Sequence, residues 1–240
     1  MKRVVTLSIV AFFVLFGLML YGASGRLGPE GFMVLGGNTQ IEKAGADIGA
    51  VEKSMMLSEA SDYWEANKEG MSETLNPLIE ERSFVQISRT KQKSLFVIDE
   101  EVTQFTYDIT VLGNNELEDT YLIYEFVTNN VSYLVYDDWR DAKEVLYSRS
   151  GDCTDKSVLM VSMLESIGIE AYVVYGTGDY DLTSHAWVAA RIDDTWLYLD
   201  PTVDDFYYVY NSLNENSEFY RYYDPIAGMF NSNTALEVRA

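Results

Sequence analysis

Apolar positions in the second half of the chain change from a helical period to a strand period. The apolar residues from Val158 to Ile167 follow helical spacing, and Gly168 ends that run as a C-cap residue would. Strands are expected at residues 170–175, 186–192 and 196–199, with a hairpin turn at Asp193-Asp194 between the last two. This order predicts an α+β fold in which the helix packs on an antiparallel sheet.

Helical spacing also dominates the region before this core. One helix is expected to run towards Trp64, and a second around Met71 to Ile87 with Pro77 in its first turn. A third helix is expected between Asp99, as its N-cap, and Gly113. The apolar positions are Ile41, Ala44, Ile48, Val51 and Met55 in the first of these helices, and Val102, Phe105, Ile109 and Leu112 in the third.

Aromatic residues are concentrated in the acidic stretch that follows Asp204. The run Phe206–Tyr210 predicts another strand of the sheet, because tyrosine suits half-buried strands. Both this run and Phe219–Tyr223 are expected to pack on the core and at the sheet edges. The alternative is that the tyrosines line a substrate groove.

The N-terminus carries an uncharged apolar run from Val4 to about Tyr21, preceded by Lys2 and Arg3. A run of about 18 residues is long enough to span a bilayer, and positive charges before it place the rest of the chain outside the cytoplasm. We therefore expect a single-pass anchor in residues 1–23. The small residues after Tyr21 leave a cleaved signal peptide and a secreted protein as the alternative. The expected organisation continues with a linker at 24–40, a helical region at 41–98 and a catalytic domain at 99–240.

Charge excludes one class of partner. The formal net charge is −21, with 38 acidic and 17 basic residues, so nucleic acid is a poor partner because phosphate binding requires basic patches.

A single cysteine excludes an internal disulfide framework. One histidine with one cysteine also makes a poor metal site, so neither a metal nor another cofactor is expected.

The only cysteine and the only histidine lie where a thiol–imidazole pair would need them. Cys153 begins the apolar helix, where free backbone N–H groups and the helix dipole favour a thiolate. His185 opens one strand of the hairpin and Asp200 follows the other, so the two come out at the same end of adjacent strands. An aspartate there can orient the imidazole. Its alternative role is that of a turn residue before Pro201, and Asp152 or Asp155 are expected to cap the helix.

Seven motifs between Leu117 and Thr202 resemble, in the same order, the transglutaminase-like core, a papain-related thiol fold. The motifs are Tyr121–Tyr133, Tyr136-Asp137-Asp138-Trp139, Ala142–Leu146 with Arg149–Asp155, Leu164–Ala171, Ser184–Val188, Trp196, and Asp200-Pro201-Thr202. The resemblance covers somewhat over a third of the chain. It implies that Cys153 is the nucleophile, His185 the base and Asp200 the orienting acid.

The resemblance also implies a second oxyanion donor from a side chain upstream of the nucleophile. Tyr136 and Trp139 are the candidates by position, because both side chains carry a donor. Nothing in the sequence resembles the calcium loops or flanking sandwich domains of the large animal transglutaminases, so crosslinking of glutamine to lysine is not assumed.

These observations predict a cysteine-dependent acyl transfer or hydrolysis at a peptide or glutamine amide, with a protein or peptide as substrate. Peptidase, amidase and transamidase reactions all remain open, because a fold does not choose among them. The alternative from another class is a catalytically silent binding or scaffold module of a cell-surface complex. The sequence does not identify the substrate, the acyl acceptor or the oligomeric state.

Overall fold

The computed structural model describes residues 39–88, 92, 94–177, 184–214, 223 and 226–239. Residues 47–240 form one compact unit. The expected membrane anchor or signal peptide at 1–23 lies outside the described residues, so its nature stays a prediction. Among the residues that are described, no helix combines the length and the apolar composition that crossing a membrane requires.

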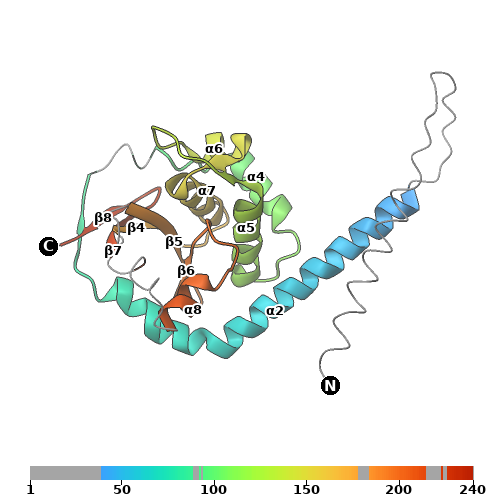
Figure 1. The fold of residues 1–240 in the computed structure, drawn as a ribbon, viewed down its shortest axis with the longest axis horizontal. Coiled ribbons are helices and arrows are strands. Elements are labelled where there is room, and N and C mark those ends of the chain that lie inside the picture. Colours follow the sequence, from blue (N-terminus) through green and yellow to red (C-terminus); the bar gives the residue numbers. More distant parts are fainter. Residues whose placement is uncertain are drawn as a thin grey trace. The chain divides into compact units, whose positions relative to one another are not determined.

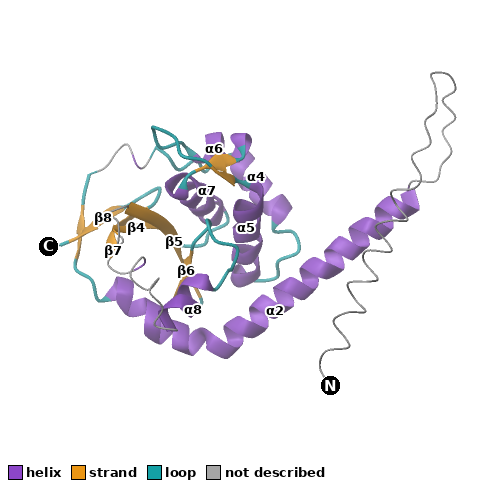
Figure 2. Ribbon diagram, in the orientation of Figure 1, coloured by secondary structure: helices purple, strands orange, loops and turns teal. Residues whose placement is uncertain are grey.

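Helices and an antiparallel sheet build the molecule, as the α+β prediction requires (Figure 1). The main sheet has the strand order β1-β8-β7-β4-β5-β6, with every neighbouring pair antiparallel, and β2 and β3 form a small parallel ladder. Apart from β1, the strands of the main sheet all follow α7 in the sequence (Figure 2). The helices are α2 (Thr39–Glu80), α4 (Glu100–Ile109), α5 (Glu116–Asn130), α6 (Ala142–Ser148), α7 (Cys153–Ser166) and α8 (Tyr208–Asn214). The strands are β1 (Phe84–Gln86), β2 (Ser132–Tyr133), β3 (Ser150–Gly151), β4 (Ala171–Thr177), β5 (Ser184–Ile192), β6 (Thr195–Leu199), β7 (Ile226–Phe230) and β8 (Ala235–Val238).

Helix α7 is the centre of the core. It lies against β4 and β5, and α4, α5 and α6 pack around it (Figure 1). Ten consecutive residues of α7, Asp155 to Leu164, are buried, so the helix is enclosed on every side rather than along one face. Cys153, the first residue of α7, therefore begins a helix that the core packs against on every side.

The hairpin of β5 and β6 forms as the sequence predicts. Asp193 and Asp194 both have positive φ, 47° and 62°, the backbone form of the two-residue turns that match the twist of a hairpin. The register pairs Val188 with Leu199 and Ile192 with Thr195. His185 and Asp200 consequently emerge at the same end of the sheet.

Two helices expected before the core are one continuous helix in the structure. The second was predicted to begin near Met71, but α2 runs unbroken to Glu80, and Pro77 lies in its last turn instead of a first turn. Trp64, Met71, Leu75 and Ile79 continue one helical face and are all buried. Their burial outweighs the single helix hydrogen bond that a proline removes.

Helix α4 begins directly after the residue that the sequence predicts as its cap. Asp99 does cap α4, where its side chain accepts from the N–H groups of Glu101 and Val102, although the helix ends at Ile109, before Gly113.

The run Phe206–Tyr210 is not a strand, since it leads into helix α8. Four of its five residues are buried, namely Phe206, Tyr207, Val209 and Tyr210, and Leu213 follows them in the core. Phe206, Tyr210 and Leu213 are spaced by four and three residues, and this helical spacing prevails over the strand preference of aromatic residues.

Candidate active site

Cys153 is the first residue of α7, and the local sequence fixes the helix start there. The Asp152 carboxylate accepts from the N–H of Asp155, and the Asp155 side chain accepts in return from the N–H of Asp152, a capping box. Both aspartates therefore have the capping role that the sequence predicts. Gly151 must be small, because a Cβ there would lie 2.6 Å from the Cβ of Asp155. The thiol is thus placed at the positive end of the helix dipole.

His185 and Asp200 meet directly. The Nε2 atom of His185 lies 2.7 Å from Oδ2 of Asp200. The other oxygen of Asp200, Oδ1, accepts from the backbone N–H of Thr202 at 2.9 Å and from its hydroxyl at 2.6 Å. Asp200 therefore has the turn function expected of a residue before Pro201, and it holds the imidazole as well.

The charges of the pair reinforce each other. Burial raises the pKa of the Asp200 carboxyl, but hydrogen bonds from His185 and Thr202 and the His185 charge bring that pKa below its ordinary value. Burial likewise lowers the pKa of His185, yet hydrogen bonds to Asp200 and Cys153 and the charges of both groups raise it to about 10. An ionised carboxylate can only accept, so Nε2 carries a proton and Nδ1 is left for the thiol.

Tyr133 is a site residue that sequence reasoning missed. Strand β2 pairs with β3 so that Tyr133 lies opposite Gly151, two residues before Cys153. Burial, the charges of Cys153 and Asp152, and a hydrogen bond with the Cys153 thiol raise the pKa of the Tyr133 phenol above 10, against the smaller effect of a hydrogen bond with the Cys153 backbone. The hydroxyl therefore stays protonated near neutral pH, within reach of both the thiol and the N–H of Cys153. A two-residue strand has no periodic pattern, so no sequence signal marked it.

The structure shows contacts of both oxyanion candidates named from the sequence with other side chains. The Tyr136 hydroxyl shares a hydrogen bond with the Ser150 hydroxyl at 2.7 Å, and the Arg140 guanidinium covers the Tyr136 ring. The Trp139 indole stacks on Phe230 with 6.2 Å between ring centroids. Trp139 lines a pocket together with His185, whereas the hydroxyl that reaches Cys153 is that of Tyr133.

Two buried side chains from other parts of the chain lie near Asp200. No pattern in the sequence linked either of them to it. The Tyr223 hydroxyl donates to Oδ2 of Asp200 at 2.8 Å, the same oxygen that receives His185. Lys156 lies one turn after Cys153 on α7 and is 3% exposed. Burial lowers the pKa of its ammonium, while the Asp200 charge acts in the opposite direction. Hydrogen bonds from His185, Tyr223 and Thr202, together with the nearby Lys156 charge, stabilise Asp200 as an anion.

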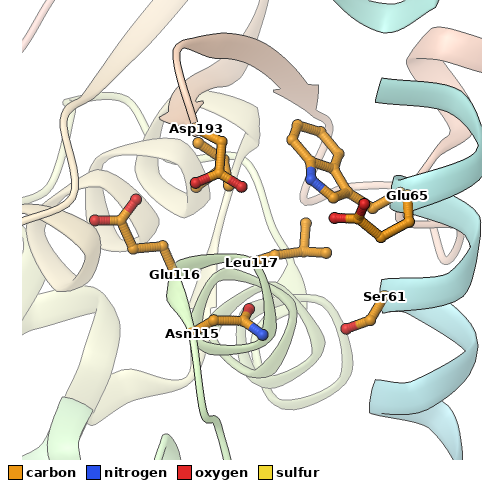
Figure 3. Close-up of a pocket in the computed structure, with 8 residues that line it drawn as sticks. Ser61, Glu65, Asn115, Glu116, Leu117 and Asp193 are labelled. Atoms are coloured by element: carbon orange, nitrogen blue, oxygen red, sulfur yellow. The ribbon is translucent and has the colours of Figure 1, made fainter. Parts of the chain in front are cut away.

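A pocket on another part of the described chain contains none of these groups. It has a volume of about 340 Å³ and is bordered by α2, α5 and the β5–β6 turn. Figure 3 shows the acidic side chains of Glu65, Glu116 and Asp193 around it, with Ser61, Asn115 and Leu117. Throughout the described part of the chain, no three His, Cys, Asp or Glu side chains are grouped as ligands for a metal ion.

Comparison with known families places residues 103–201 in a match to the transglutaminase-like superfamily. This match confirms the resemblance that the ordered motifs indicated between Leu117 and Thr202. Among curated proteins, no sequence matches the chain.

Several solved structures resemble parts of the chain. A protein from Cytophaga hutchinsonii, described as a proposed cysteine protease, is 22% identical with a TM-score of 0.40, covering 48% of this chain and 39% of its own. A structure described as a TGase is 18% identical with a TM-score of 0.37, covering 57% of this chain and 38% of its own. LapG of Legionella pneumophila is 14% identical with a TM-score of 0.39, covering 58% of this chain and 86% of its own. The match therefore spans well under half of the first two of these proteins.

Proposed function

We propose that this chain, which carries a transglutaminase-like core in residues 103–201, catalyses cysteine-dependent acyl transfer or hydrolysis at a peptide or glutamine amide. The observation that carries the proposal is the position of His185, whose imidazole hydrogen-bonds to Asp200 and whose pKa is raised by Cys153 as well as by Asp200. A nucleophile, a base and a group that orients the base are the three parts of a catalytic triad.

The reaction follows from this arrangement in two halves. The proton of the Cys153 thiol passes to Nδ1 of His185, where the raised pKa of the imidazole holds it near neutral pH, and the Cys153 sulfur attacks the amide carbonyl carbon. The negative oxygen that forms is stabilised by the Cys153 N–H and, we propose, by the Tyr133 hydroxyl. The imidazolium then protonates the departing amine as the bond between the carbonyl carbon and nitrogen breaks. The acyl group stays on Cys153 as a thioester. Water or an amine attacks the thioester and gives its proton to His185. The bond between the carbonyl carbon and sulfur then breaks, which releases the acyl product and leaves the freed Cys153 sulfur beside the protonated His185.

Removal of the Tyr133 hydroxyl tests its part in this mechanism. Tyr133→Phe is expected to lower kcat by about 10²-fold with little change in KM, because the lost donor acts on charge that develops only in the transition state. Turnover is measured on an amide substrate found by mass spectrometry of peptide-library products. Tyr136→Phe is the matched control, since its hydroxyl bonds to Ser150. A loss in Tyr136→Phe with normal turnover in Tyr133→Phe would return the role to Tyr136.

The ionisation of His185 provides a test that needs no substrate. His185 is the only histidine, so its ring protons give one isolated set of NMR signals. They are expected to titrate near pH 10 in the folded protein and near 6.5 in urea. Because the folded pKa is the higher one, the stability that the imidazolium contributes is complete below pH 6.5 and disappears as the pH rises through about 10. A folded-state midpoint at or below 6.5 would show that the pair does not form.

A further inference from the structure

A pocket of about 230 Å³ opens beside His185. Thr154, which follows Cys153 directly in α7, also lines it, so the pocket borders the reacting thiol. The remaining lining residues are Trp139, Tyr175, Ser184, Ala186 and Phe230. Pockets that enclose whole small-molecule ligands measure about 300–1,000 Å³. This one has the size for a single side chain of a longer substrate.

Three aromatic rings form much of its wall. Phe230 is 4% exposed and packs against the buried Phe96, so its position is fixed by the core. Trp139 stacks on Phe230 at an interplanar angle of 9°, and Tyr175 lies against Phe230 with 6.1 Å between ring centroids. Trp139 is 43% exposed. The wall therefore has a buried base and an accessible indole that an incoming side chain can contact.

The sheet holds the opposite side of the pocket in place. Tyr175 pairs with Ala186 on β5 and with Gly228 on β7. A Cβ at Gly228 would lie 2.4 Å from the Tyr175 hydroxyl, so the absence of a side chain there lets the tyrosine ring pack closely across the strand. This side of the pocket thus comes from three adjacent strands, β4, β5 and β7.

The lining residues carry no Asp, Glu, Lys or Arg side chain. An ammonium or guanidinium that entered the pocket would lose hydration and meet no carboxylate, and a carboxylate could meet only His185 at the edge, whereas an apolar side chain would gain contact with the rings. We propose that this pocket is a specificity subsite that receives an aromatic or large aliphatic side chain next to the amide attacked by Cys153. The proposal rests on the proposed function, whose substrate class it narrows.

A reactivity series tests the subsite together with catalysis. Peptidyl chloromethyl ketones with Phe, Leu, Lys or Glu, placed next to the electrophile or one residue further, are reacted with the full chain, and labelling of Cys153 is followed by intact mass. The Phe and Leu probes are expected to react at least about tenfold faster than the Lys and Glu probes, a difference typical of one apolar contact. Trp139→Ala should reduce that preference, and Tyr107→Ala, which removes an exposed aromatic outside the pocket, should keep it.

A binding series separates the subsite from the chemistry. Acetylated tripeptide amides with the same four central residues are titrated into the Cys153→Ala full chain, and binding is followed by isothermal titration calorimetry, which works equally in variants that lack Trp139. Tighter binding of the Phe and Leu peptides, lost in Trp139→Ala and kept in Tyr107→Ala, supports the subsite even if no probe labels Cys153, and in that case the proposed function alone fails. Equal affinities for the four peptides, or a preference that survives in both Trp139→Ala and Tyr175→Ala, would overturn the subsite.

Discussion

Replacing His185 with alanine is expected to slow the labelling of Cys153 by a peptidyl electrophile by about 10²-fold or more. The thiolate is the reacting form of cysteine, and His185, whose pKa Cys153 and Asp200 raise, is the group that we propose accepts its proton. Cys153 is the only cysteine in the chain, so intact mass measures labelling at this one atom.

The control for this experiment is Tyr147→Ala, which removes an exposed aromatic ring outside the site. Circular dichroism of both variants establishes that they fold. If Cys153 in His185→Ala is labelled at the wild-type rate, the thiol and imidazole do not act as a pair. The alternative of a catalytically silent binding or scaffold module would then be preferred.

Asp200→Asn is expected to lower turnover by up to about 10⁴-fold while the protein stays folded. Asp200 accepts from His185 and Tyr223 at Oδ2 and from Thr202 at Oδ1. An asparagine keeps its oxygen towards the two Thr202 donors and turns its NH₂ towards His185. The imidazole must then carry its proton at Nδ1, where it can no longer take a proton from the thiol. The pKa of His185 should fall towards 6.5, which the same NMR titration measures.

Turnover separates this role from a turn role alone, whereas a modest loss of stability is expected in either case. The Tyr223 hydroxyl loses its acceptor, so the melting temperature should fall by the equivalent of about 1–3 kcal/mol. Asp193→Asn is the matched control, because Asp193 has a positive φ in the hairpin turn and asparagine adopts that conformation readily. Near-normal turnover in Asp200→Asn, as in Asp193→Asn, would leave Asp200 as a turn residue only.

The positions of the three proposed triad residues could be predicted from the sequence, whereas the side chains around them could not. Cys153, His185 and Asp200 could be placed because each lies at an end of a strongly patterned element, and element ends are determined by local signals such as caps and turns. Tyr136 and Trp139 were chosen by position in the chain alone. The hydroxyl that reaches Cys153 belongs to Tyr133, on a ladder of two residues. So short a ladder depends on long-range pairing with Ser150 and Gly151, which no local pattern encodes.

The same distinction applies to the helices and to the C-terminal tyrosines. Strand preference suggested a β-strand at Phe206–Tyr210, but burial of the residues at helical spacing selected helix α8. The helix break expected before Met71 is absent for a similar reason, since tertiary burial of one continuous face stabilises α2 through Pro77.

By itself the sequence determined the elements with strong local signals: the capped start of α7 at Cys153, the hairpin turn at Asp193-Asp194, and the emergence of His185 and Asp200 at one end of it. Only the tertiary structure decided which side chains from distant segments complete the site. Tyr133 reaches the thiol, Tyr223 and Lys156 surround Asp200, and Trp139 joins Phe230 in the pocket wall. Capping and turn formation act over a few residues, whereas these contacts depend on how α7 packs against the sheet.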